Sequence, residues 1–236
     1  MYCFNIKAYS VTASFRIPET HTFQKTLPLP PLTSIIGLLG AAIGLPFAES
    51  MDFYYYNHIR VGVIGTSQSR VNDLWKYRKI KSGNETISAV LTRELLFGLN
   101  IELFIAAENE RIVKDIQHAV INPYYALTAG CSDDLLKIKS VGSVTRINPE
   151  PLYHFLNTIL PGDQGGNYES NIDINKIPLL KEIFTPRVYL LPVEFDFTSE
   201  DRRVKRREPF TFIETPVKLI KPIQGLKFAE KSVALL

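Results

Sequence analysis

The stretch ASFRIPETHTFQKTLPLPPLTSIIGLLGAAIG, residues 13–44, decides how the amino-terminal part of the chain folds. No charged residue occurs from Thr26 to Ala48, which approaches the roughly 20 residues that a bilayer crossing requires. Prolines interrupt that stretch, and the uninterrupted part, Leu32–Leu45, has the length of a buried core helix. Thr33 or Ser34 is placed to cap this helix. The sequence therefore favours a core helix of a soluble protein over a membrane span.

Three glycines of this helix, Gly37, Gly40 and Gly44, lie at spacings of three and four and share one face. Each glycine costs a helix roughly 1 kcal/mol relative to alanine. A helix keeps such a face where another backbone approaches closely, and a sheet is the simplest partner. We therefore expect the glycine face to pack on a sheet.

Hydrophobic periodicity outlines the rest of the chain. It predicts strands at residues 1–15, Tyr54–Gly65, Val188–Phe197 and Pro209–Ile213, two strands joined near Gly98 within Val90–Ala107, and helices at Glu108–Val120 and Pro151–Leu160. Three polar segments separate these elements: 66–86 and 161–175, both read as loops, and the basic run 202–207, read as a charged turn beside an edge strand. This order predicts one domain with a ferredoxin-like α+β core and appended β elements.

Composition excludes several classes of protein. The net charge is only +3, from 27 Lys and Arg against 24 Asp and Glu, so no overall basicity indicates nucleic acid. Two cysteines, Cys3 and Cys131, make neither a disulfide framework nor a zinc site. The amino-terminal MYCFNIKAYS lacks the features of a secretory signal, which favours a cytoplasmic protein.

The common enzyme motifs are absent from the sequence, including phosphate-binding loops, zinc-protease motifs and nucleophile elbows. The four histidines are scattered without metal-ligand spacing, and Asp133-Asp134 is typical of a turn or a helix cap. We therefore expect no metal, no cofactor and no catalytic group.

Cations and aromatic residues alternate in segment 70–81, which contains Trp75 and Tyr77. Proteins bind single-stranded nucleic acid with cations along the phosphates and aromatic rings stacked on bases. An exposed loop of this composition suits that task. The alternative is that Trp75 anchors the loop to the core while the lysines are merely solvated.

The stretch Ala13–Gly44 also resembles the amino-terminal signature of the Cas-five family of CRISPR-associated proteins, with S-F-R-x-P followed by a Pro-Pro-x-[ST] step into a glycine-bearing helix. The segment YALTAGCSDDLLKI, Tyr125–Ile138, is similar to the family's L-G-R-S-[DE]-D-L segment, with Cys131 where a basic residue is common. A third similarity is TRELL, Thr92–Leu96. The matches span about residues 1–141.

This resemblance implies a RAMP-superfamily protein with a ferredoxin-like (RRM-like) core, a thumb insertion at about 66–90 and a β-rich part at about 151–236. Such proteins bind the 5′ handle of the CRISPR RNA (crRNA) in type I Cascade, an antiviral complex. They bridge the Cas-seven backbone subunit and the large Cas-eight or Cas-ten-like subunit, with target DNA near the PAM as a further contact and no membrane. Subtypes I-A, I-B and I-D all fit.

The resemblance also implies which residues contact RNA. They are Arg16, Thr33, Ser34, Arg70, Trp75, Lys76, Arg78, Arg93, Gly130 and Ser132. In subtype I-C, relatives cut the precursor RNA without metal, using a Tyr/Lys/His group, and this chain has His21, Lys25 and Tyr77. Non-catalytic binding is the first expectation. Metal-independent ribonuclease activity and a structural or membrane-associated role without RNA are the alternatives.

Overall fold

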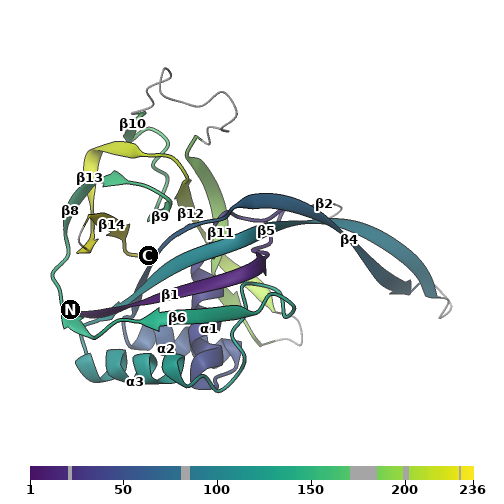
Figure 1. The fold of residues 1–236 in the computed structure, drawn as a ribbon, viewed down its shortest axis with the longest axis horizontal. Helices are drawn as coiled ribbons and strands as arrows, with labels where there is room; N and C mark the ends of the chain where they lie inside the picture. The colour runs from purple at the N-terminus through teal and green to yellow at the C-terminus, as the bar shows by residue number, and fades with distance from the viewer. Residues whose placement is uncertain (21–22, 81–85, 171–184, 199–201, 229) are drawn as a thin grey trace.

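A long sheet divides the molecule, with the helices on one side and a smaller sheet on the other (Figure 1). This computed structural model describes residues 1–20, 23–80, 86–170, 185–198, 202–228 and 230–236. Its helices are α1 (Leu32–Ile43), α2 (Phe47–Tyr56) and α3 (Glu110–Ile121). Its strands are β1 (Tyr2–Ala13), β2 (Phe23–Gln24), β3 (Arg60–Thr66), β4 (Ser69–Ile80), β5 (Thr86–Ala107), β6 (Leu136–Val141), β7 (Thr145–Arg146), β8 (Glu150–Phe155), β9 (Thr158–Pro161), β10 (Tyr168–Ser170), β11 (Arg187–Asp196), β12 (Arg203–Ile213), β13 (Val217–Phe228) and β14 (Lys231–Ala234).

The large sheet has the order β11-β12-β9-β3-β5-β1-β6, with β2 and β4 also paired to β5 and β7 paired to β1. The smaller sheet joins β10, β13 and β14, with β8 on the other side of β13. Along β1 the alternation read from the sequence is confirmed, because Phe4, Ile6 and Ala8 are buried and Lys7 is exposed. The architecture is the mixed, sheet-rich α+β fold that the sequence predicts.

Two hydrophobic layers cover the two faces of the large sheet. Phe4 and Ile6 of β1 pack with Ile35 of α1 and Val113 of α3 on the helix side. On the opposite side, Cys3, Phe104 and Ala106 pack with three residues near the carboxyl end, Leu226, Val233 and Leu235. The smaller sheet therefore closes over part of the face that the helices leave uncovered.

The glycine face of α1 meets α2 rather than a sheet, which corrects the expectation. A Cβ on Gly40 would lie 2.6 Å from the Ser50 Cβ, so the two helices touch through this glycine. Gly44 ends α1 with φ 92°, the left-handed conformation that glycine adopts readily. No single helix in the described part of the chain is long and apolar enough to cross a membrane, but α1 and α2 together meet the length and composition criteria as a pair bent by 102°.

Residues 69–80 and 86–97 form a two-stranded arm that projects from the sheet (Figure 1). The expected exposed loop at 66–86 is therefore wrong for its described residues, because β4 pairs with β5 from Ser69↔Phe97 to Ile80↔Thr86. The two strands expected within Val90–Ala107 are one strand, β5. Gly98 does not turn the chain; with φ 63° it allows an irregularity inside a continuous strand.

Four further segments differ from the sequence prediction. Residues 54–56 end α2 instead of beginning a strand. The helix expected at Pro151–Leu160 is replaced by β8 and β9, because Leu152 and Phe155, three residues apart, imitate a helical face while pairing in a sheet. The basic run 202–207 is no turn, because from Arg203 onward it lies in β12. Within the predicted loop at 161–175, β10 occupies Tyr168–Ser170, and 171–175 lie outside the described residues.

Helix α1 offers a matched test of this packing. Gly37→Ala places its Cβ 3.6 Å from Phe47, an ordinary contact, so it should raise stability by up to about 1 kcal/mol through helix propensity. Gly40→Ala gains the same propensity but overlaps Ser50, and overpacking costs about 1–3 kcal/mol. Urea unfolding should show Gly40→Ala to be clearly less stable than Gly37→Ala. Equal midpoints would contradict the α1–α2 contact.

Candidate nucleic-acid interface

A hollow of about 520 Å³ opens where the end of β1, the first turn of α1 and strands β11 and β12 meet. Four of the residues predicted to bind RNA line it: Arg16, Thr33, Ser34 and Gly130. They come from three segments that are far apart in the sequence. The fold therefore brings part of the predicted site together.

Two arginines of the basic run, Arg202 and Arg207, complete the lining. The guanidinium of Arg202 lies 5.0 Å from the ring centres of both Phe47 and Phe195. Arg207 is paired with the partly exposed Glu19 at 3.5 Å. Among the described residues that line the hollow there are three arginines and no carboxylate. Its charge suits a ligand that carries several negative charges.

Gly130 fixes the wall of the hollow opposite α1. Its φ of 105° is left-handed, and a Cβ here would overlap the carbonyl oxygen of Ser14. The Ser14 N–H donates to the Ala129 carbonyl at 3.0 Å, which holds the two segments together. Behind them the buried Asp134 accepts a hydrogen bond of 2.5 Å from the Thr12 hydroxyl. Asp134 is therefore a structural group of this turn.

Helix α1 begins beside the hollow without a side-chain cap. Pro31 occupies the N-cap position, and Thr33 and Ser34 lie in the first turn, so the expected capping role is wrong. The amides of a helix's first turn carry partial positive charge, although the Ser34 N–H already donates to the Pro31 carbonyl at 2.9 Å. With the arginines they form one electropositive surface.

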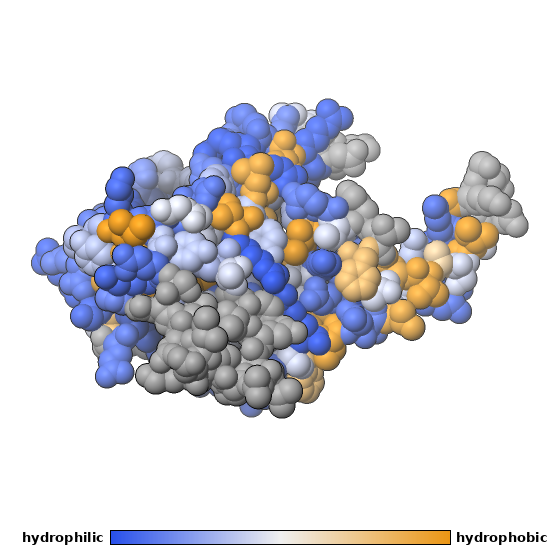
Figure 2. Space-filling view, turned by 90° about the horizontal axis from the view of Figure 1, so that it is seen from above, coloured by the Kyte–Doolittle hydropathy of each residue, from blue (hydrophilic) through white to orange (hydrophobic). Residues whose placement is uncertain are grey.

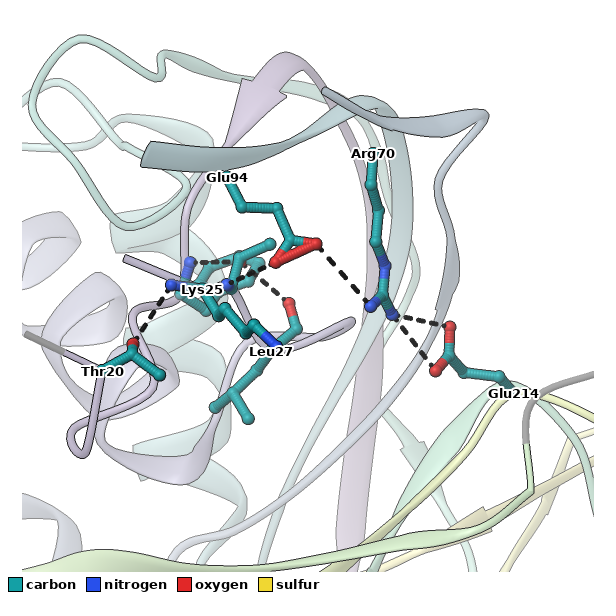
Figure 3. Close-up of polar contacts among 8 residues, drawn as sticks. Thr20, Lys25, Leu27, Arg70, Glu94 and Glu214 are labelled. Atoms are coloured by element: carbon teal, nitrogen blue, oxygen red, sulfur yellow. Dashed lines mark hydrogen bonds and ion pairs between the residues drawn. The ribbon is translucent and has the colours of Figure 1, made fainter. Parts of the chain in front are cut away.

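Arg70 holds the base of the arm to the body of the protein (Figure 3). Its guanidinium donates to both carboxylate oxygens of Glu214 at 3.1 and 3.2 Å, and it lies 3.8 Å from Glu94. Glu94 also accepts from the backbone N–H of Thr26 at 3.3 Å. These contacts give Arg70 a structural role.

Arg93 clamps the arm from its other face. It donates to Asp73 at 3.0 Å and to the Cys131 sulfur at 3.8 Å, and its side chain is only 14% exposed. Burial, the largest single effect, would lower the pKa of the guanidinium, but the hydrogen bond to Asp73 and the charges of Cys131, Asp73 and Asp134 together raise it. Arg93 thus fixes the position of the Cys131 loop beside the hollow.

On the outer arm, Trp75 and Tyr77 lie on one face, and Lys76 and Arg78 lie on the other. Register pairs Trp75 with Leu91 and Lys76 with Val90, and neighbouring residues of a strand point in opposite directions. Trp75 is 46% exposed and stacks on Tyr77 with ring centres 5.7 Å apart, so it does not anchor the arm to the core.

Lys76 and Arg78 share the other face of the arm with three exposed apolar residues, Leu74, Ile80 and Val90. Figure 2 shows hydrophobic surface along the arm. The alternating sequence therefore places the two aromatic rings on one surface of the arm, and Lys76 and Arg78 with apolar residues on the other.

The remaining predicted residues lie apart from the hollow or outside the described residues. Ser132 is exposed on the loop before β6. Of the residue types needed for RNA cleavage, His21 lies outside the described residues, whereas Lys25 follows β2 and Tyr77 lies on the arm. Tyr77 pairs with Ala89 of β5, whereas β2 pairs with β5 at Arg93. Four residues of strand separate Ala89 from Arg93, which is roughly 13 Å. Lys25 and Tyr77 therefore do not share a site.

Sequence reasoning missed Arg202 and Arg207 as members of the site. The signal was present, because five of the six residues from 202 to 207 are basic. Two of these cations, Lys205 and Arg206, are held by Glu194 on β11, at 2.5 and 3.2 Å. Of the remaining cations in this run, Arg202 and Arg207 line the hollow, and the structure is needed to identify them.

Comparisons with known proteins give one family match over most of the chain. A sequence profile described as CRISPR-associated protein (Cas_Cas5) matches residues 6–200. Among curated proteins, no sequence matches significantly.

Three solved structures share the fold at low sequence identity. One is a chain of a CRISPR RNA-guided surveillance complex, with 16% identity, a TM-score of 0.57 and coverage of 93% of this chain and 91% of that one. Another is a CRISPR protein from Archaeoglobus fulgidus, with 12% identity, a TM-score of 0.53 and coverage of 99% and 98%. The third is a chain of the Type III-B Cmr-beta complex bound to cognate target RNA and AMPPnP, with 11% identity, a TM-score of 0.50 and coverage of 93% and 86%.

The Arg70–Glu214 contact can be measured by a double-mutant cycle. Arg70→Ala, Glu214→Ala and the double variant should give a coupling energy of about 1 kcal/mol in urea unfolding, because both side chains are largely buried and one guanidinium nitrogen donates to both carboxylate oxygens. The exposed pair Lys114–Glu110 on α3 is the control and should give about 0.3–0.5 kcal/mol. A coupling energy for Arg70–Glu214 no larger than that of the control would contradict the role of this contact in holding the arm.

Proposed function

The chain belongs to the CRISPR-associated Cas5 family, and we propose that it is a non-catalytic crRNA-binding subunit of a cytoplasmic type I Cascade complex. A role in CRISPR systems follows from the family. The finer proposal is that the chain binds the 5′ handle of the crRNA and bridges the backbone and large subunits.

The hollow carries this proposal. Arg16, Arg202 and Arg207 converge there with the uncapped start of α1, and no carboxylate is found among its described lining residues. Arginine is suited to phosphate because its planar guanidinium can donate two parallel hydrogen bonds. The hollow accordingly fits a bent, phosphate-rich segment such as an RNA end.

We further propose that the chain is a single domain with a ferredoxin-like RAMP core. The elements β1, α1 with α2, β3, β5, α3 and β6 follow the β-α-β-β-α-β order, and their sheet order β3-β5-β1-β6 supports that assignment. The β-rich part from about residue 151 supplies strands to both sheets, which supports one domain rather than two.

The arm is our candidate for the thumb. Its clamped base and exposed outer half suit a lever that reaches a neighbouring subunit. Leu74, Val90 and Ile80 supply apolar surface for the Cas-seven backbone subunit, while Lys76 and Arg78 lie beside them for the RNA that this subunit carries. The large subunit and target DNA near the PAM remain proposed contacts without an assigned surface.

Binding to repeat-derived handle RNA tests the proposal. Arg16→Ala combined with Arg202→Ala should weaken binding at least ten-fold at physiological salt. The slope of log K against log salt should fall by about 1.4, since each lost phosphate contact on a single strand removes about 0.7. Arg111→Ala with Arg146→Ala removes the same charge from exposed sites elsewhere and should change little.

The binding reactions are run in excess EDTA, and the RNA is recovered on a denaturing gel. We expect the RNA to remain intact and to bind the wild type more tightly than the variant with Arg16→Ala and Arg202→Ala. A single site-specific cut would replace the scaffold proposal with a metal-independent ribonuclease. Absence of salt-sensitive RNA binding in the wild-type chain and in its assembled complex would favour a structural role without RNA.

A further inference from the structure

The face of the large sheet that points away from the helices is only half covered. Ile6 and Ala8 of β1 pack in the helix-side core, so Lys7 and Tyr9 point to the other face. The smaller sheet covers this face around Cys3, as described above. Farther along β1 the face stays open.

Lysines gather on the open part. Lys7, Lys137 and Lys139 are all exposed, and among the described residues no carboxylate lies within ion-pair distance of any of them. In the register, Lys137 lies opposite Tyr9, whose other neighbour is Asn100. Two of these lysines come from β6 and one from β1, so the charge is spread along neighbouring strands.

One of these lysines is held in place rather than freely mobile. The Lys139 ammonium lies 4.6 Å from the centre of the Tyr9 ring and donates to the Asn100 side-chain oxygen at 3.1 Å. A cation fixed in this way loses less side-chain entropy when it binds an anion. Lys139 is therefore preorganised to bind an anion, unlike a lysine whose side chain is freely solvated.

Lys7, Lys139 and Asn100 line a groove of about 370 Å³, and Lys137 lies outside its lining. Lys231 of β14 belongs to the same lining. Glu102, the single carboxylate among the described lining residues, is already occupied, because Lys231 pairs with it and Asn5 donates to it at 2.6 Å. The groove therefore keeps a surplus of positive charge.

We propose that this lysine groove binds the phosphate backbone of a single-stranded nucleic acid, at a site that shares no lining residue with the hollow. Diagonal neighbours across antiparallel strands are about 7–8 Å apart, which suits successive phosphates of an extended strand. Cations inside the groove favour a single strand that lies in it over a duplex that rests on its rims. Lysines are point charges without base readout, so binding has little sequence preference.

The test uses oligonucleotides without repeat sequence, so that handle recognition does not contribute. Fluorescein-labelled 15-mers of uridine and of thymidine are titrated with the full chain at several salt concentrations and followed by anisotropy. Lys7→Ala with Lys139→Ala should weaken binding several-fold and lower the salt slope by about 1.4. Comparison of the two oligomers shows whether RNA or DNA is preferred.

Lys114→Ala with Lys221→Ala is the matched control, because it removes two exposed lysines outside the groove. It should bind both oligomers like the wild type. The hollow variant, Arg16→Ala with Arg202→Ala, should lose handle RNA but keep the homopolymers, so the two sites can fail independently. Thermal unfolding checks that every variant is folded.

Two results would overturn the groove. One is that the lysine-groove variant binds both homopolymers as the control does. The other is that the wild-type chain binds neither homopolymer with salt-dependent affinity.

Discussion

Strand β5 is the element on which the other parts depend, because hydrogen bonds fix it along both edges. One edge pairs first with β4 and then with β3, and the other pairs with β2 and β1. At its middle, adjacent residues face opposite ways: Glu94 reaches Arg70, while Arg93 reaches Asp73 and Cys131. The arm is therefore a stiff extension of the central sheet, clamped on both faces at its base.

The hollow follows from this framework. The arm's base fixes the Cys131 loop through Arg93, Gly130 lets that loop lie against Ser14, and the end of β1 then stands beside the start of α1. Strand β12 supplies the remaining charge. Positive charge is thus concentrated in the hollow of a protein whose net charge is only +3. The lysine groove is a second concentration of positive charge, on another surface. Two such sites suit a subunit that holds nucleic acid within a larger assembly.

How far the sequence predicts this structure depends on whether the deciding contacts are local. Period-two burial along β1 and period-3.6 burial along α3 are local, and both elements are where the sequence places them. Gly98 is a residue type common in turns, but its neighbours Phe97 and Leu99 both pair with other strands and keep the chain in β5. Leu152 and Phe155 have helical spacing that only the partner strand β13 overrules. For the site, the sequence finds Arg16 and Gly130, whereas Arg202 and Arg207 need the β11–β12 pairing to be recognised.

Cys131 offers the most direct test that RNA occupies the hollow, because this half-buried thiol lines it. Cys3, the other cysteine, is an internal control, since burial raises its pKa to about 12 and keeps it unreactive in the folded protein. Maleimide labelling of the native chain is followed by mass spectrometry with and without saturating handle RNA. We expect bound RNA to slow the labelling of Cys131 at least ten-fold. An unchanged rate, with the RNA shown to be bound in the same sample, would contradict the central claim.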